Sequence, residues 1–268
     1  MMEYRNENEI VMHSLGRSGS HAIVNWIASM FKEPIYFFNN CWTEDPYRAP
    51  IPYLRRVRKR PLEKFFVPLP KLKHSSEDEI SEYRNIHKHC LMYSYEHRDI
   101  RKLKDGEFVQ DRTLIGESRN RYNVLILRDF FNWLASCLLP SAKPRSTILD
   151  NAVGLWKVYA GEFLGKTNYL KEKRVCLSFN QWFVDEDYRI KIADSLDLKY
   201  SDFALDYAGS PSSFDGRQYK HGKAREMKVF DRWKILKDNS NYREHVNYHP
   251  EARELSYEIF GKEERMPW

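Results

Sequence analysis

The sequence has no apolar run near the roughly 20 residues that a membrane-spanning helix needs, so it predicts no transmembrane segment. Its first residues, MMEYRNENEI, are polar, and they predict neither a secretory signal nor a transit peptide. The four cysteines (Cys41, Cys90, Cys137 and Cys176) are scattered without a CxxC spacing, which argues against a zinc site and against a disulfide framework. These absences together favour a cytoplasmic protein in a reducing compartment.

The composition is that of an ordinary globular protein, with 42% hydrophobic and 31% charged residues in a chain of 268. This length suits one large domain or two small ones. We expect a single domain over residues 1–268 that carries a basic insertion at about 40–85, where six prolines interrupt regular structure. A second irregular stretch, residues 207–228, is rich in Gly, Ser and basic residues and predicts a long functional loop.

The positive charge is concentrated in one part of the chain. Residues 48–74 hold nine Lys or Arg and one Glu, a surplus of +8 against a net charge of +6, which leaves the remaining chain at −2. This distribution predicts one cationic patch and argues against a general nucleic-acid coat. The basic cluster Arg55–Arg60 could attract an anionic acceptor or an anionic membrane surface, or it could be a solvated charged face.

Strand-like and helix-like segments alternate along the chain, and this alternation predicts an α/β fold. A strand followed by a helix and another strand implies crossover connections, hence a mainly parallel sheet with helices on both faces. The expected strands are EIVMHSL (9–15), CLMYSY (90–95), NVLIL (123–127) and RVCLSF (174–179). The expected helices cover residues 20–31, 130–139, 147–164 and 185–196.

The segment SLGRSGSH, residues 14–21, joins the first strand to the first helix, and we call it the anion loop. Small residues at such a turn let backbone N–H groups point at an anion, and the helix N-terminus adds partial positive charge. Arg17 adds a guanidinium, and Ser18 and Ser20 add hydroxyls. A Walker A loop, GxxxxGK[ST], would need a Lys after Gly19, where Ser20 stands, which argues against nucleotide-triphosphate hydrolysis.

A second anion site is predicted at the end of the strand NVLIL. Arg128 ends that strand, and Ser136 follows eight positions later on the next helix. Ligands of α/β sheets collect at the carboxyl ends of strands, where an Arg can bind a phosphate in a bidentate manner. Two such sites at neighbouring strand ends predict a ligand with two separated phosphate groups.

These features resemble the cytosolic and Golgi-type sulfotransferases that use 3′-phosphoadenosine 5′-phosphosulfate (PAPS). The 5′-phosphosulfate loop of that family, Lys or Arg followed by Ser-Gly-Thr/Ser, is matched by Arg17, Ser18, Gly19 and Ser20. Its 3′-phosphate site, an Arg at a strand end and a Ser eight residues later, is matched by Arg128 and Ser136. The resemblance covers most of residues 8–261 outside the insertion. It implies a P-loop NTPase-like parallel sheet, PAPS as donor and 3′-phosphoadenosine 5′-phosphate (PAP) as product, without a required metal.

The same resemblance extends the donor site. SPSSF (210–214) resembles the adenine-facing loop, and VFDRWK (229–234) resembles a family segment that ends in Trp and Lys. The family's Arg-Lys-Gly triplet is absent in that form, so either Lys220, Lys223 or Arg225 substitutes for it or the 3′-phosphate is bound more weakly. Phe179 aligns with an adenine-contacting aromatic, or it is a core residue. The additional donor-binding candidates are therefore His21, Phe179, Ser212, Phe214, Lys223 and Arg225.

Sulfuryl transfer also needs a base that takes the acceptor's proton. Glu96 and His97 follow the strand CLMYSY, and the family places a His or Glu base at the corresponding strand end. We prefer Glu96, with His97 as the alternative, although Glu96 could also pair with Arg98 or Arg101. Arg17 would stabilise the developing negative charge.

The sequence thus predicts a sulfotransferase that acts on a hydroxyl or amine acceptor, with a carbohydrate as the first acceptor to consider because the chain has seven Trp and seventeen Tyr. Two alternatives stay open. One is a nucleotide or small-molecule kinase on the same sheet, which would depend on magnesium. The other is a non-catalytic protein that binds the nucleotide without turnover.

Overall fold

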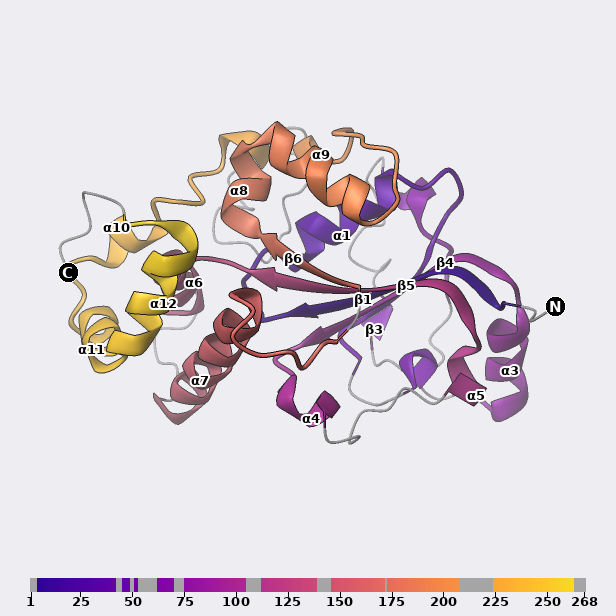
Figure 1. The fold of residues 1–268 in the computed structure, drawn as a ribbon, viewed down its shortest axis with the longest axis horizontal. Coiled ribbons are helices and arrows are strands. Elements are labelled where there is room, and N and C mark those ends of the chain that lie inside the picture. Colours follow the sequence, from indigo (N-terminus) through magenta and orange to yellow (C-terminus); the bar gives the residue numbers. More distant parts are fainter. Residues whose placement is uncertain are drawn as a thin grey trace.

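The protein is described by a computed structural model over residues 4–41, 45–48, 51–52, 62–69, 75–104, 112–138, 146–171, 173–207 and 224–262. The chain forms a sheet of six strands in the order β3-β2-β4-β1-β5-β6 (Figure 1). Every strand pair is parallel except β2 with β3 at one edge. The strands are β1 (Asn6–Ser14), β2 (Tyr36–Asn39), β3 (Ile51–Pro52), β4 (Lys88–Glu96), β5 (Ser118–Leu127) and β6 (Arg174–Ser178).

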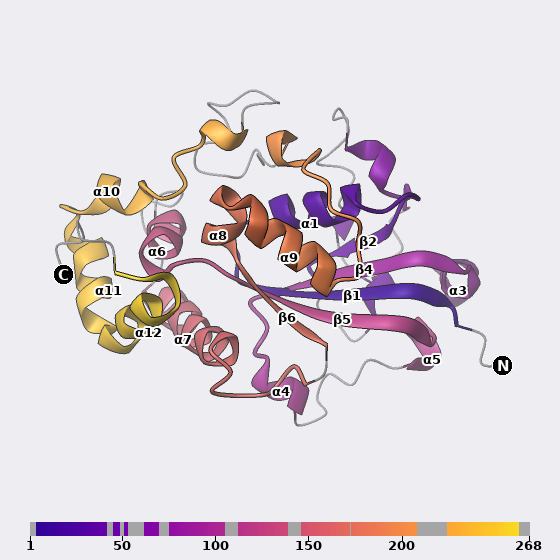
Figure 2. The same cartoon turned by 45° about the horizontal axis from the view of Figure 1, so that its top comes forward.

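Helices cover both faces of this sheet, as Figures 1 and 2 show, so the predicted α/β architecture is confirmed. One face carries α1 (Ser20–Ser29), α8 (Phe179–Val184) and α9 (Glu186–Ser195). The other carries α6 (Phe130–Leu138), α7 (Ser146–Phe163), α11 (Ser240–Tyr248) and α12 (Pro250–Phe260). The remaining helices are α3 (Glu77–Asn85), α4 (Arg101–Lys104), α5 (Arg112–Ile115) and α10 (Arg232–Leu236).

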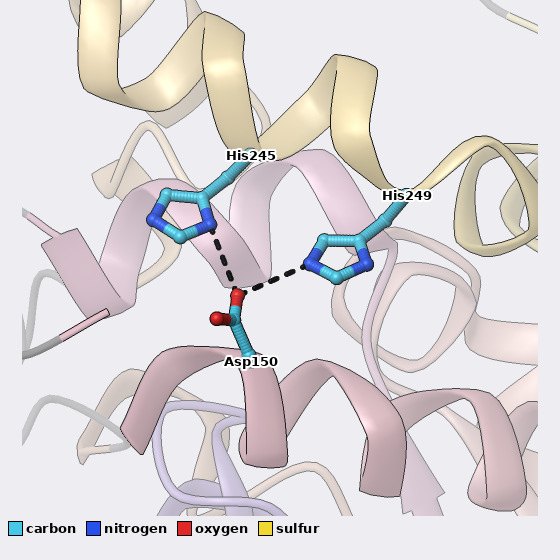
Figure 3. A group of neighbouring side chains, drawn as sticks. All are labelled: Asp150, His245 and His249. Carbon is cyan, nitrogen blue, oxygen red and sulfur yellow. Dashed lines mark ion pairs between the residues drawn. The ribbon is translucent and has the colours of Figure 1, made fainter. Parts of the chain in front are cut away.

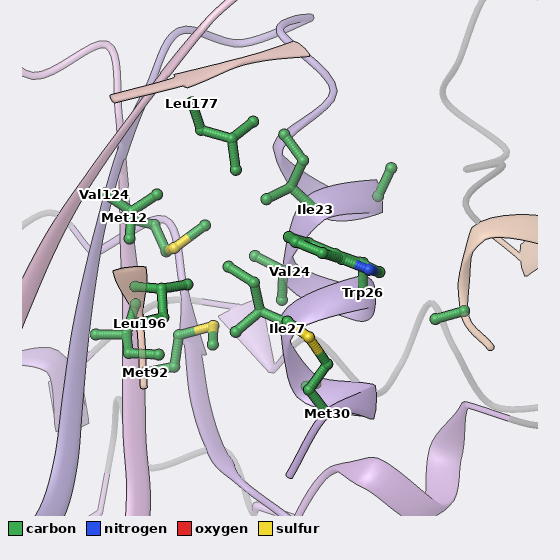
Figure 4. Packing of buried hydrophobic residues seen from close by; sticks show 14 of the residues in the cluster. Met12, Ile23, Val24, Trp26, Ile27, Met30, Met92, Val124, Leu177 and Leu196 are labelled. Atoms are coloured by element: carbon green, nitrogen blue, oxygen red, sulfur yellow. The ribbon is translucent and has the colours of Figure 1, made fainter. Parts of the chain in front are cut away.

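The burial of apolar side chains on both faces of the sheet follows from the alternation of side chains along the strands. Met12 of β1 and Val124 of β5 pack on one face against Ile23 and Ile27 of α1 (Figure 4). Leu125, the neighbour of Val124, belongs to the core on the opposite face. Complete burial of an Ile side chain stabilises the folded state by about 1.5–3 kcal/mol, and both isoleucines of α1 are 0% exposed. The strands are apolar on both sides because both sides are covered.

The basic insertion supplies β3, the edge strand of the sheet beside β2. β3 pairs with Phe38 and Asn39 of β2, and a parallel bridge joins Ile35 to Phe66. Two short 3-10 helices (Pro46–Arg48 and Glu63–Phe65) and α3 make up much of the rest. The basic cluster Arg55–Arg60 lies outside the described residues. Over the ranges that the structure describes, no helix combines the length and the apolarity that crossing a membrane requires.

The buried His13 of β1 predicts a loss of stability in mild acid. Its side chain is 1% exposed, and Nε2 lies 3.3 Å from Asn123 Oδ1. Burial lowers the pKa of His13 to about 4. In the unfolded chain this imidazole takes up a proton near pH 6.5, whereas in the folded protein it stays neutral down to about pH 4. Stability is therefore complete above pH 6.5, and it falls by about 3 kcal/mol as the pH drops from 6.5 to 4.

Denaturant unfolding of the wild type and of His13→Gln at pH 7 and pH 4.5 measures this contribution. We expect the stability difference between the two proteins to shrink or reverse at the lower pH, because only the wild type has to neutralise an imidazole. An equal difference at both pH values would contradict the assignment to His13.

Candidate active site

The anion loop leaves the carboxyl end of β1 and runs directly into α1. Arg17 and Gly19 both lie in the left-handed region, with φ values of 74° and 84°. Gly19 occupies the N-cap position and has no side chain with which to cap the first turn of α1. The first N–H groups of a helix have no intrahelical partner, so this turn offers donors to an anion. The Ser18 hydroxyl is also buried, and none of the described residues bonds to it.

Two glycines of the anion loop allow aromatic rings to lie against the backbone. A Cβ at Gly16 would stand 2.5 Å from His97 Nε2, and a Cβ at Gly19 would stand 2.2 Å from a ring carbon of Phe179. The loop is further fixed by Trp133, whose Nε1 donates to the Gly16 carbonyl at 3.0 Å. The loop is therefore contacted by the residue after β4, by the first residue of α8 and by α6.

The second predicted anion site lies beside the first. Arg128, at 2% exposure, follows β5 and donates from Nη1 to Ser136 Oγ at 3.3 Å. The same nitrogen lies 3.5 Å from the Arg17 carbonyl oxygen, and Arg17 Nε donates to the Ser136 carbonyl at 3.0 Å. The structure thus brings Arg17 to Arg128 and Ser136, although Arg17 is more than 100 positions away from both along the chain.

A third arginine joins this group, one that the sequence analysis did not single out. Arg232, at the start of α10, is 5% exposed, and its Nη1 donates to Ser136 Oγ at 2.8 Å. Its position is set by Asn132, whose Oδ1 accepts from the Arg232 backbone N–H at 3.0 Å. Arg232 lies within VFDRWK, the segment whose resemblance to the family concerns its Trp and Lys. Arg128 and Arg232 therefore share one hydroxyl, and we call them, with Ser136, the arginine pair site.

Glu96 lies on the other side of the anion loop. It ends β4 in register with Ser14 of β1, and the two strands are parallel. The Ser20 hydroxyl lies 3.4 Å from Glu96 Oε1, so the carboxylate lies next to the first turn of α1. A carboxylate here is close to any anion held by the loop and can face an acceptor.

His97 is held differently. Its φ of 57° turns the chain sharply after β4, and its Nε2 accepts a hydrogen bond from the Gly16 N–H at 3.1 Å. The loss of water around the ring lowers the pKa of His97, and the Glu96 carboxylate partly opposes that shift. The Nε2 lone pair is already in use in the contact with Gly16. This arrangement suits a residue that positions the loop.

The remaining donor-binding candidates are placed less directly. His21 Nε2 lies 3.0 Å from Asn39 Oδ1 at the end of β2, so this ring faces the insertion side of the loop. Phe179 is 4% exposed, and the Arg128 guanidinium lies 5.1 Å from its ring centre. It therefore belongs to the core and borders the site, and its contact with adenine stays a prediction.

The predicted contribution of residues 207–228 is only partly visible. Arg225 pairs with Asp206 at 3.0 Å and lies 3.8 Å from Asp202, so its charge is matched by carboxylates. Its role in phosphate binding stays a prediction. Ser212, Phe214, Lys220 and Lys223 lie outside the described residues.

Comparison with known proteins gives a fold and no close relative. No family model and no curated protein matches this sequence. Among solved structures, the chain is similar to the sulfotransferase domain of the olefin synthase from Synechococcus PCC 7002, with a TM-score of 0.55 over 97% of each chain. The chain has the fold of a sulfotransferase domain. The sequence identity is 10%, so this likeness concerns the fold.

A second structure in the comparison is the sulfotransferase domain from the curacin biosynthetic pathway. It matches at a TM-score of 0.45 and 11% identity, over 90% of this chain and 96% of that domain.

Proposed function

We propose that this protein transfers a sulfuryl group from PAPS to a hydroxyl or amine acceptor. The observation that carries the proposal is the meeting of two anion-binding features at Ser136. Arg17 of the anion loop donates to the Ser136 carbonyl oxygen. Arg128 and Arg232 both donate to the Ser136 hydroxyl. A nucleotide with a phosphate at each end of its ribose has the charge distribution that such a site requires.

The residues present suit such a nucleotide. Two guanidinium groups that share one hydroxyl in a buried setting repel each other, and a phosphate dianion between them would relieve that repulsion. Near the anion loop, the Ser18 hydroxyl and the first N–H groups of α1 are suited to the oxygens of the 5′ group. The 3′-phosphate would therefore bind at Arg128, Ser136 and Arg232, and the 5′ group at Ser18, Gly19 and Ser20.

In the proposed reaction, the bound donor supplies the activated sulfuryl group. Arg17 and the loop N–H groups stabilise the negative charge that grows on the leaving oxygen. Glu96 accepts the proton of the attacking hydroxyl or amine from the acceptor side of the loop. His97 keeps Gly16 in place through its occupied Nε2. The protein's own groups complete these steps without a metal ion at this site.

The tryptophans do not support a carbohydrate acceptor. The five tryptophans that the structure describes are at most 3% exposed and belong to the core, so they cannot stack on a sugar: Trp26, Trp133, Trp156, Trp182 and Trp233. The carbohydrate acceptor stays a prediction, as do a cytoplasmic location, a single domain over residues 1–268 and an anionic acceptor drawn by the cluster Arg55–Arg60.

The proposal is tested by the thermal stabilisation that PAP gives to Arg128→Lys. PAP binds only the folded protein and should raise the melting temperature of the wild type. Lysine keeps the charge but lacks the planar guanidinium, which can donate to a phosphate and to Ser136 at the same time. Most of the rise in melting temperature should therefore disappear. Because Arg128 is 2% exposed, alanine would also leave a buried hole, and lysine is the sharper substitution.

Arg189→Lys is the matched control. Arg189 lies on α9 and is 4% exposed. Its guanidinium makes a bidentate contact with the Asp202 carboxylate, at 3.0 and 2.9 Å. The Arg189→Lys variant should have a lower melting temperature without ligand, and PAP should raise that temperature by as much as in the wild type. A wild-type shift that Arg128→Lys retains would remove the two-phosphate argument. Stabilisation by ATP with magnesium in place of PAP would favour the kinase alternative.

A further inference from the structure

Three potential metal-binding side chains meet away from the donor site, on the face covered by α7 and α11. Figure 3 shows Asp150 of α7 directed toward His245 of α11 and His249. The candidate ligand atoms of the three side chains all lie within 4.8 Å of one another. The proposed sulfuryl transfer makes no use of them. They therefore need an explanation of their own.

The backbone fixes both histidines. His245 and His249 are four positions apart, so they lie on the same face of α11, whose C-cap is His249. His249 is also the N-cap of α12, and its carbonyl oxygen accepts from the N–H groups of Ala252 at 3.1 Å and Arg253 at 3.3 Å. The two imidazoles are nearly parallel, with an angle of 9° between their planes. Both rings therefore start from the same helix junction, and both lie beside Asp150.

The distances fit a shared cation better than direct hydrogen bonds. Asp150 Oδ1 lies 3.6 Å from His245 Nδ1 and 3.4 Å from His249 Nε2. Both separations exceed the distance of roughly 2.7–3.2 Å that usually joins the donor and acceptor atoms of a hydrogen bond. Two ligands of a tetrahedral zinc ion, each about 2.0–2.1 Å from the metal, stand about 3.3 Å apart. One oxygen facing two imidazole nitrogens at such distances has the spacing of a metal-binding site.

The surroundings also suit a metal ion. His249 Nε2 is buried, and no hydrogen-bond partner occupies it among the described residues. The Asp150 side chain is 41% exposed, which leaves the cluster open to solvent on one side. The nearby cation Lys157 is engaged by Glu251 at 2.7 Å, on α12. A water molecule could complete a four-coordinate site from the open side.

We propose that Asp150, His245 and His249 bind one divalent transition-metal ion of the zinc class. A site with two imidazoles and one carboxylate suits zinc-class ions, whereas magnesium and calcium prefer sites made of oxygen ligands alone. The ion would fasten α7 to the junction of α11 and α12. α11 also contacts α6 through Tyr242, whose hydroxyl donates to the Phe131 carbonyl at 3.3 Å. The metal would therefore steady the helices behind Ser136, as a structural ion and not as part of the transfer reaction.

Metal binding is measured on the full chain after treatment with a chelator. We expect one equivalent of Zn²⁺ to bind in a calorimetric titration and to raise the melting temperature by several degrees. Co²⁺ should give the intense visible absorption of a tetrahedral site. Both signals should be lost in His249→Ala and in Asp150→Asn, which keeps the size of a side chain that is already partly exposed.

His87→Ala is the matched control. The His87 side chain is 60% exposed and lies 3.4 Å from Glu7. It stands between α3 and β4, and Figure 1 shows α3 at the opposite end of the molecule from α11. It should keep the full stoichiometry, the thermal shift and the cobalt spectrum. Zinc binding that is equal in His249→Ala and His87→Ala would show adventitious surface binding and overturn the proposal. The proposal would also be overturned if the wild type bound no stoichiometric Zn²⁺ and if added Zn²⁺ left its melting temperature unchanged.

Discussion

Glu96→Gln is expected to slow sulfuryl transfer by about 100-fold or more while PAP binding stays near that of the wild type. Glutamine keeps the shape of the side chain and its contact with the Ser20 hydroxyl, now 3.4 Å from Oε1, but it cannot accept the acceptor's proton. Glu96 lies opposite Ser14 in the register of two parallel strands, so it reaches the same edge of the sheet as the anion loop. Steady-state turnover and PAP titration of the same preparations separate the two effects.

Asp99→Asn and His97→Gln are the controls for this experiment. Asp99 lies three residues further on, and its carboxylate is engaged by Arg101 at 2.7 Å, so its loss should change turnover little. His97→Gln should weaken the placement of Gly16 and have a smaller effect than Glu96→Gln. A reversed order would make His97 the base. If neither substitution slows turnover, the base lies elsewhere, with the insertion at 40–85 as the first region to examine.

Arg17→Ala is expected to lower kcat by about 10²–10³-fold, the cost of losing one group that stabilises charge in the transition state. The guanidinium is anchored by Nε on the Ser136 carbonyl at 3.0 Å, between the anion loop and the arginine pair site. Arg17→Lys should retain much of the rate, since a Lys at this position is common in the sulfotransferases that the sequence resembles. Turnover at saturating donor is the quantity to compare.

The matched control for Arg17 is Arg101→Ala. The Arg101 side chain is 55% exposed and pairs with Asp99, so its removal should leave kcat within a few-fold of the wild type. An Arg17→Ala variant with wild-type kcat would show that the anion loop does not face the reacting group. A loss confined to donor affinity would assign Arg17 to binding alone.

Much of the sheet could be predicted because its strands are buried on both faces and read as continuous apolar runs. NVLIL lies within β5, although β5 begins at Ser118, where the polar SRNRY gives no strand signal. Residues 185–196 form a helix as expected, but α8 precedes it as a separate element that begins at Phe179, directly after β6. The helices α11 and α12 were not predicted, since their sequences are largely polar and their few apolar residues pack only in the folded context.

The site shows a similar division. Arg17, Arg128 and Ser136 could be found because each belongs to a local pattern at a strand end. Arg232 could not be found this way, because it belongs to no strand-end pattern and its contact with Ser136 spans 96 positions. The sequence analysis did not identify the group Asp150, His245 and His249, because Asp150 lies on α7 and only the packing of that helix brings the three together.

The central claim, that the protein reads two phosphates of one nucleotide, is tested most directly by calorimetric titration with PAP and with adenosine 5′-monophosphate. The two ligands differ only in the 3′-phosphate, which the account places at Arg128, Ser136 and Arg232. We expect PAP to bind at one site and about 100-fold more tightly, as charge-assisted hydrogen bonds to two arginines would give. Equal affinity for the two ligands, or no binding of PAP at all, would contradict the account.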